Sequence, residues 1–196
     1  MRRFPPRRKT MCCDRGPSSA TGRSALWDGD GWRIRPSGWA DLEEILAVYA
    51  RARAFMREHG NRTQWAGGHP ARALVEQDIA MGTGFVLESE AGLEGVFALQ
   101  TGVDPTYAHI EDGAWLSDAP YGTIHRLASA GRVHGVLRAC VAWCAERQPH
   151  LRVDTHADNA PMLHLLPALG FVRCGIIHVA DGTPRIAFER LPQVGG

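Results

Sequence analysis

Apolar residues repeat with the spacing of a helix in some segments of the chain and with that of a strand in others. The order of these segments predicts a mixed α/β domain. A helix is predicted from a capping Asp41 to about His59, and a second one over residues 71–81. Short runs rich in Val, Phe and Leu, bounded by turn residues, predict strands. The predicted strands cover residues 32–35, 85–88, 93–100, 123–129, 151–155, 173–179 and 185–190.

Two more helices complete the pattern. One ends near Arg147, and the other begins near Asn159 and ends at Gly170. A polar and aromatic insertion, residues 101–119, precedes the fourth strand, and a short strand is predicted within it over 114–116. The order β-α-α-β-β-β-α-β-α-β-β predicts an α/β (α+β) fold with a mixed, mostly antiparallel sheet of about seven strands and helices on both faces.

Composition divides the chain into three parts. Residues 1–31 are rich in Arg, Pro, Ser and Gly without apolar periodicity, which predicts a disordered basic extension. Residues 32–191 form a single predicted domain, and residues 192–196 form a C-terminal tail. The sequence has no apolar run of the length of a signal peptide or a membrane span, so no membrane partner is predicted.

Charge is placed unevenly. The first 15 residues hold six basic residues and one acidic residue, whereas the whole chain carries a net charge of +1, so the rest of the chain is acidic. An acidic domain is a poor electrostatic match for nucleic acid, although contact of the basic extension with nucleic acid stays open. Lys9 is the only lysine, which excludes a phosphate-binding or Schiff-base lysine from the domain.

The five cysteines lack the spacing of a disulfide framework or a metal site. This usage predicts a reduced, cytoplasmic protein. Cys140 and Cys144 lie four residues apart on a predicted helix, which favours two buried apolar positions over half of a metal site. No metal is therefore predicted.

A candidate anion site lies where the fourth strand leads through a glycine loop into a helix. The loop contains Gly131 and Gly135, and the first N–H groups of the helix that follows have no partner within the helix. Those N–H groups and the helix dipole favour an anion, and Arg132 adds a positive charge suited to a diphosphate. The pattern predicts a phosphate-bearing cofactor.

Three motifs in the same order resemble the GNAT superfamily of acetyl-CoA-dependent N-acetyltransferases. They are Ile34-Arg35-Pro36 with Asp41-Leu42, the loop Arg132-x-x-Gly135, and Asn159 followed eleven residues later by Gly170-Phe171. The resemblance covers residues 32–191. Two positions depart from the family pattern: Leu137 replaces a usually small residue, and Leu166 replaces the tyrosine that commonly serves as general acid.

The resemblance implies acetyl-CoA as cosubstrate, held with its thioester where strands 123–129 and 151–155 splay apart. It also implies that a backbone N–H of Leu127 or Ala128 polarises the acetyl carbonyl. The cofactor-binding residues it implies are Leu127, Ala128, Ser129, Arg132, Val133, His134, Gly135, Val136, Leu137 and Asn159.

An amine acceptor must lose a proton before it attacks, so the site needs a base. The family's usual carboxylate base falls at Thr123, which cannot accept that proton. Strand alternation places Thr123, His125 and Leu127 on one face, which makes His125 a candidate, and Glu111 in the insertion is the second. A hydrogen-bonded sheet histidine and a solvated loop carboxylate are the alternative interpretations.

The resemblance therefore predicts an N-acetyltransferase that moves an acetyl group to a small-molecule or peptide amine by direct attack in a ternary complex. The alternative is a non-catalytic acyl-CoA-binding sensor or regulatory module, which the replacements at Leu137 and Leu166 keep open. A dinucleotide-binding enzyme is disfavoured because the sequence has no Gly-x-Gly-x-x-Gly. Family members often form dimers, so a homodimer is also open.

Overall fold

The structure is a computed structural model that describes residues 26–27 and 31–193. Residues 1–25, 28–30 and 194–196 lie outside the described residues. Most of the predicted basic extension, Cys12, Cys13 and the end of the predicted tail therefore fall outside the description.

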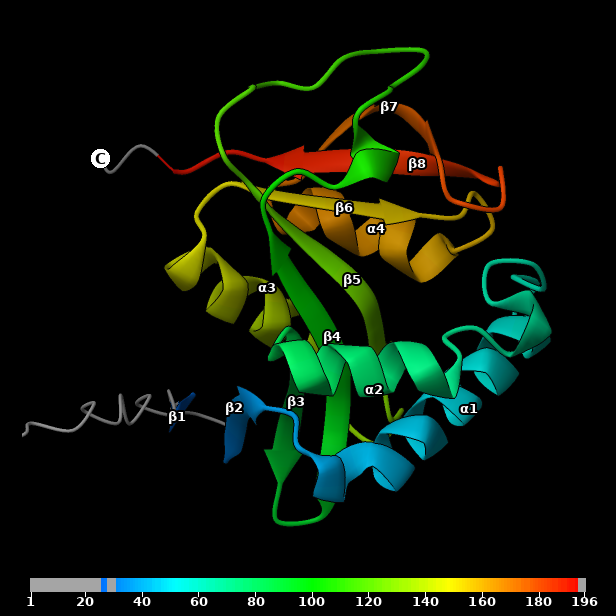
Figure 1. The fold of residues 1–196 in the computed structure, drawn as a ribbon, viewed down its shortest axis with the longest axis vertical. Coiled ribbons are helices and arrows are strands. Elements are labelled where there is room, and N and C mark those ends of the chain that lie inside the picture. Colours follow the sequence, from blue (N-terminus) through cyan, green and yellow to red (C-terminus); the bar gives the residue numbers. More distant parts are fainter. Residues whose placement is uncertain (1–25, 28–30, 194–196) are drawn as a thin grey trace, which may run out of the picture.

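One eight-stranded sheet has the strand order β1-β2-β3-β4-β5-β6-β8-β7 (Figure 1). Among the strands that the structure describes, the β5–β6 pair is the only parallel one, and every other neighbouring pair is antiparallel. The predicted fold class is confirmed, with the two-residue β1 as an additional strand. The strands are β1 (Leu26–Trp27), β2 (Trp32–Pro36), β3 (Gly84–Ser89), β4 (Gly92–Thr101), β5 (Gly122–Ser129), β6 (Leu151–Thr155), β7 (Val172–His178) and β8 (Pro184–Arg190).

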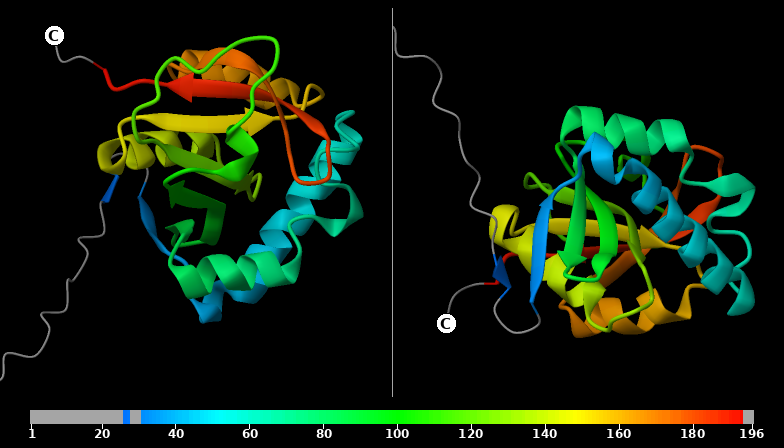
Figure 2. Two further views of the ribbon diagram at one scale, coloured as in Figure 1. Left: turned by 45° about the horizontal axis from the view of Figure 1, so that its top comes forward. Right: turned by 90° about the horizontal axis from the view of Figure 1, so that it is seen from below.

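In the described residues, four α-helices cover the two faces of this sheet. They are α1 (Leu42–Glu58), α2 (Arg72–Met81), α3 (Val136–Arg147) and α4 (Ala160–Ala168). Helices α1 and α2 lie on one face, and α3 and α4 lie on the other (Figure 2). No helix in the described part of the chain is long and apolar enough to cross a membrane.

Strand alternation divides the apolar residues of the sheet between two cores. Val86 and Val96 pack with α1 and α2, whereas their neighbours Leu87 and Phe97 pack with α3 and α4. Successive side chains of a strand point to opposite faces, so one apolar strand supplies both cores. Cys140 and Cys144 are fully buried in the α3 core, where burial raises the pKa of each thiol.

The insertion between β4 and β5 does not contain the predicted strand over 114–116. Instead, Pro105–Tyr107 form a 3₁₀ turn, and Glu111 makes a single β-bridge to Ile176 of β7. Side chains anchor the rest of the insertion: the Arg152 guanidinium lies 3.9 Å from the ring centroid of Trp115. The strand prediction was wrong because the segment makes only isolated backbone hydrogen bonds to β7, such as Ala114 N to Cys174 O at 3.0 Å, and no continuous ladder.

Candidate active site

The parallel strands β5 and β6 pair over only two residues each. Gly122 pairs with Leu151 and Thr123 pairs with Arg152, and beyond these positions the two strands diverge (Figure 1). Strand β6 continues along β8 as far as Thr155, while β5 continues along β4. The expected splay between β5 and β6 therefore begins just before His125.

A β-bulge lies in β5 beside this opening. His125 pairs with Ala98 and Ala128 pairs with Val96, so the two residues between them on β5 oppose a single residue on β4. Arg126, inside the bulge, has a φ of +53°, which is unusual for a residue with a side chain. A bulge leaves the extra residue out of the ladder and reorients the strand.

The bulge reverses the side-chain alternation of β5. Leu127 packs against the α3 core together with Ile124, whereas Ala128 packs in the α1 core. The expectation that Thr123, His125 and Leu127 share one face is therefore wrong for Leu127. The extra residue of the bulge shifts the period of two by one position.

An ion pair ties the bulge to α2. Arg126 donates from Nε to Asp78 Oδ2 at 3.0 Å and from Nη2 to Asp78 Oδ1 at 2.7 Å. Both side chains are nearly buried, so removing either partner would leave a poorly solvated charge. The unusual backbone conformation at Arg126 is thus supported by a two-point contact from the neighbouring helix.

A cavity of about 540 Å³ lies at the splay. It is bounded by β5, β6, the connection between α1 and α2, the start of the insertion, and the turn between β7 and β8. Its polar and charged lining residues are Thr63, Gln64, His69, Gln100, Asp104, Thr106, His125, Arg126, Asp154, Asn159, Asp181 and Arg185. The apolar lining residues include Ile124, Leu127 and Val153 from the two splayed strands.

His125 is hydrogen bonded to a carboxylate in this cavity. Its Nε2 lies 2.8 Å from Asp104 Oδ2, and Thr106 donates from both its backbone N–H and its hydroxyl to the other carboxylate oxygen. Burial alone would raise the pKa of Asp104, but the hydrogen bonds from His125 and Thr106 lower it to about 2. The carboxylate is therefore ionised at neutral pH and favours the tautomer in which Nε2 carries the proton.

A second carboxylate in the cavity has the opposite tendency. Burial raises the pKa of Asp154, although the Tyr107 hydroxyl donates to its Oδ1 at 2.8 Å. Arg185 Nε lies 3.9 Å from Asp154 Oδ2. The cavity thus contains one carboxylate held ionised and one with a raised proton affinity, a difference typical of acid–base sites.

The connection between α1 and α2 closes one side of the cavity. Gln64 Oε1 accepts from Asn159 Nδ2 at 2.9 Å, and Gln64 O accepts from Arg185 Nη2 at 3.3 Å. Thr63 Oγ1 lies 3.1 Å from His156 Nε2. These contacts link the first half of the chain to the ends of β6 and β8 across the splay.

The predicted phosphate loop leads into α3 as expected. Gly135 is the N-cap residue with a φ of +91°, and its carbonyl accepts the first helical bond from Ala139. In the described part of the chain, the backbone N–H groups of residues 132–135 have no acceptor in the protein. The backbone therefore fits an anion at this helix N-terminus.

Arg132 is engaged within the protein. Its Nη2 donates to Leu93 O at 2.8 Å, and its Nε lies 3.3 Å from a carboxylate oxygen of Glu94. Since Glu94 is almost fully buried, part of the Arg132 charge is compensated locally. The backbone N–H groups are consequently the uncompensated part of this loop.

The structure separates the two predicted base candidates. His125 lines the cavity, whereas Glu111 does not and has a side chain that is 51% exposed. The β-bridge to Ile176 holds Glu111 against β7, and its nearest charged group is His109. The expectation that Glu111 reaches the acceptor cleft is therefore not met.

The remaining predicted cofactor residues are divided between the cavity and the loop. Leu127 and Asn159 line the cavity, and Asn159 also caps α4 through its side chain. The other members, Ala128, Ser129, Val133, His134, Val136 and Leu137, lie along the end of β5, the loop and the first turn of α3. Leu166 is fully buried in the core and does not line the cavity.

Sequence reasoning did not find Asp104. It lies in the insertion, 21 residues before His125, where no strand or helix period fixes its direction. An aspartate followed by Pro-Thr is typical of a side chain that caps a turn. Asp104 Oδ1 does accept a hydrogen bond from Thr106 N. That local signal predicts the turn but not the histidine partner.

Comparisons with known proteins agree with this geometry. No protein-family model matches the sequence, and no curated protein matches it. A GNAT-family acetyltransferase from Streptococcus agalactiae 2603 is 29% identical, with a TM-score of 0.77 over 84% of this chain and 98% of that chain. A GNAT-family acetyltransferase from Listeria monocytogenes 4b F2365 is 20% identical, with a TM-score of 0.60 over 81% and 94%.

A third solved structure shares the fold alone. The ribosomal-protein-S18-alanine N-acetyltransferase from Escherichia coli is 15% identical, with a TM-score of 0.54 over 84% of this chain and 96% of that chain. The Streptococcus agalactiae match supports assignment of this chain to the GNAT superfamily, as the sequence motifs predicted, whereas the two more distant matches show the fold alone. The Streptococcus agalactiae match also supports acetyltransferase activity in general and leaves the acceptor open.

Proposed function

We propose that this protein transfers the acetyl group of acetyl-CoA to an amine of a small molecule or peptide, by direct attack in a ternary complex. The observation that carries the proposal is the cavity of about 540 Å³ at the β5–β6 splay, which contains the His125–Asp104 pair. A base is thereby placed where the splayed strands expose backbone and apolar surface. Acetyl-CoA supplies the activated acetyl thioester.

His125 acts as the base in this proposal. Asp104 holds Nε2–H, so the lone pair of Nδ1 accepts a proton from the incoming ammonium. In the described part of the chain, Nδ1 has no protein partner. The neutral amine then attacks the acetyl carbon, and the nitrogen–carbon bond forms while the carbon–sulfur bond breaks. The thiolate leaves without prior protonation because a thiol is a comparatively strong acid, and the second proton of the attacking nitrogen then passes to the released thiolate or to water.

Two backbone regions would hold the cosubstrate. The N–H groups of residues 132–137 would hold the diphosphate, with Arg132 at their edge, and the bulged segment at Leu127 or Ala128 would polarise the acetyl carbonyl. The unpartnered N–H groups of the loop fit this role. The ion pair of Arg132 with Glu94 makes the backbone the larger contributor.

Two measurements on the purified protein test this proposal. Calorimetry measures binding of acetyl-CoA and CoA, and a thiol-release assay measures turnover with a panel of amines. We expect binding of both nucleotides and amine-dependent thiol release. Absence of acetyl-CoA binding would overturn the proposal.

The second candidate function is a non-catalytic acyl-CoA-binding sensor. The observation in its favour is the fully buried Leu166 at the position of the family's tyrosine acid. Binding of acetyl-CoA without thiol release from any amine would support the sensor over the enzyme. Binding with release would support the enzyme.

We also infer a cytoplasmic location without a membrane or nucleic-acid partner for the domain. The cysteines of the described part, Cys140, Cys144 and Cys174, are free thiols, the state expected in a reducing compartment. A homodimer stays a proposal that a measurement of molecular mass in solution would test.

A further inference from the structure

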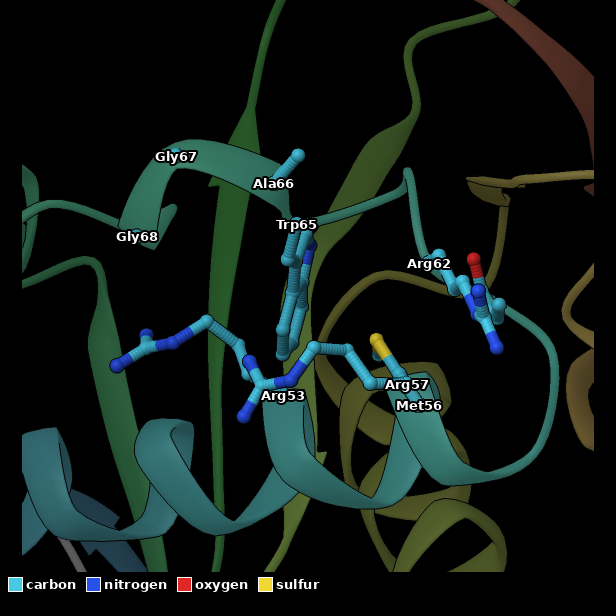
Figure 3. A pocket seen from close by; sticks show the side chains of 9 residues that line it. Arg53, Met56, Arg57, Arg62, Trp65, Ala66, Gly67 and Gly68 are labelled. Atoms are coloured by element: carbon cyan, nitrogen blue, oxygen red, sulfur yellow. The ribbon is translucent and has the colours of Figure 1, made fainter.

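A second cavity lies beside the catalytic one, between the end of α1 and the connection that follows it. It has a volume of about 320 Å³ and is lined by Arg53, Met56, Arg57, Asn61, Arg62 and Trp65 with the segment 66–68 (Figure 3). Three of these residues, Met56, Trp65 and Ala66, also line the catalytic cavity. The two cavities therefore adjoin across Trp65.

The charge of this second cavity is entirely positive. Arg53, Arg57 and Arg62 line it, and it has no carboxylate among its lining residues. None of the three guanidinium groups has a carboxylate within 4.0 Å in the described part of the chain. Figure 3 shows Arg53 and Arg57 extending from α1 beneath Trp65, with Arg62 on the other side of Met56.

The two arginines that line the catalytic cavity are already paired. Arg126 is bound to Asp78, and Arg185 lies beside Asp154. Among residues 26–27 and 31–193, Arg53 is the only one of the three with a protein hydrogen-bond partner, from its Nη1 to His69 O at 3.3 Å. Unpaired guanidinium groups in a concave site favour carboxylate or phosphate oxygens, which they bind through charge-assisted hydrogen bonds.

One further observation points to a ligand in this region. Asn61 is buried, and its Oδ1 has no hydrogen-bond partner in the protein, so an acceptor is left for a ligand N–H or O–H.

We propose that the Arg53–Arg57–Arg62 cavity binds an anionic group of the acceptor, so that the substrates are small amines that also carry a carboxylate or a phosphate. This assignment rests on the proposed acetyl transfer at His125. The amine lies beside His125 in the catalytic cavity, and the remainder of the molecule extends past Trp65 to the arginines. Acceptor charge, rather than acceptor shape alone, then determines selectivity.

The first test compares acceptors that differ only in charge. Straight-chain ω-amino acids of two to six carbons, their primary amides and the corresponding aminoalkyl phosphates are assayed for acetyl transfer. At the best chain length we expect kcat/KM for an anionic member to exceed that of its amide by about tenfold or more. The carboxylate and phosphate series identify which anion is preferred, and equal values for acids, phosphates and amides at every length would overturn the proposal.

Variants locate the effect. In the Arg53→Gln/Arg57→Gln double variant, the anion-to-amide ratio of kcat/KM is expected to fall to within about twofold of unity. Arg51→Gln is the matched control, because Arg51 is an exposed arginine of the same helix that does not line the cavity. A double variant that keeps the wild-type ratio would place the anion site elsewhere.

A binding measurement separates this inference from the proposed function. N-acetylated ω-amino acids and their amides are titrated into the protein without acetyl-CoA, with wild type and the double variant compared. Tighter binding of the acids that is lost in the double variant supports the anion site even if no amine is acetylated, in which case only the proposed transfer fails. Acetylation of amines without any preference for the acids in either assay supports the transfer and overturns the anion site.

Discussion

His125 Nε2 lies 2.8 Å from Asp104 Oδ2, although the two residues belong to different elements. His125 is on β5 and Asp104 lies in the insertion after β4, so the pair forms only when the insertion folds back over the splay. The pair fixes the imidazole in the cavity, and in the proposed reaction Nδ1 is the nitrogen that accepts the proton. It is the feature on which the proposed chemistry depends.

Replacing His125 should remove the base. His125→Gln keeps a side chain that can donate to Asp104 but has no titratable nitrogen. We expect kcat to fall by about 10²-fold or more, while the calorimetric affinity for acetyl-CoA stays near that of wild type. A thiol-release assay on an identified amine measures the first quantity.

Two matched variants accompany this test. His164→Gln removes an exposed histidine of α4 and should leave kcat near the wild-type value. Glu111→Gln tests the second base candidate predicted from the sequence. The structure places Glu111 outside the cavity. A large loss in Glu111→Gln with little loss in His125→Gln would show that our assignment of the base is wrong.

Asp104 should position His125 and also contribute to stability. The folded-state pKa of Asp104 is about 2, below its ordinary value of 3.8, because hydrogen bonds from His125 and Thr106 outweigh the effect of burial. A depressed pKa stabilises the fold above pH 3.8, and this contribution is lost as the pH falls toward 2. Asp104→Asn should therefore reduce the dependence of Tm on pH in that range.

The same variant has a kinetic consequence. An amide accepts more weakly from Nε2–H, so the imidazole is held less firmly, and kcat should fall on the order of tenfold. Asp118→Asn, at an exposed position of the same insertion, is the control for both measurements. A Tm profile for Asp104→Asn that runs parallel to wild type between pH 4 and 2 would contradict the assigned role in stability.

Much of the fold could be predicted from the sequence because the spacing of apolar residues shows which face of a helix or strand is buried. The alternation of Val86 with Leu87, and of Val96 with Phe97, places two cores on opposite sides of the sheet. The Gly135 loop and the Asn159 cap follow from local backbone requirements, which neighbouring residues reveal. These parts of the fold depend on interactions between residues that are close in the sequence.

The parts that could not be predicted depend on contacts between distant segments. The bulge at Arg126 interrupts the period of two, and the partner that supports it, Asp78, lies on another element. Asp104 reaches His125 through an insertion without periodicity. Glu111 is held by a bridge to β7, which no local pattern indicates.

The phosphate loop should bind acetyl-CoA through its backbone. Gly135→Asp places a negative charge at the N-terminus of α3, and like-charge repulsion should weaken acetyl-CoA binding by about 1–3 kcal/mol. Gly135→Asn is the matched control, because it has nearly the same shape and the same demand for a positive φ without the charge. An added Cβ meets only the Trp32 ring, at 3.7 Å, so the two variants share the backbone strain and differ in charge.

The comparison of these two variants separates charge from strain. We expect calorimetry to show a larger loss of affinity for Gly135→Asp than for Gly135→Asn. Equal and unchanged affinities in both folded variants would remove the diphosphate from this loop.

Restoring the family's tyrosine at position 166 should destabilise the protein without improving catalysis. Leu166 is fully buried in the α3 core and does not line the catalytic cavity, so a larger ring overpacks the core and buries its hydroxyl. Overpacking of this kind costs about 1–3 kcal/mol, and Leu166→Tyr should lower the free energy of unfolding measured in urea by that amount. Leu165→Tyr is the control, because Leu165 on the same helix is 41% exposed and can accept a larger side chain. If Leu166→Tyr instead retains wild-type stability and raises kcat, then the side chain at 166 reaches the reacting sulfur, and the thiolate does not leave unaided as proposed here.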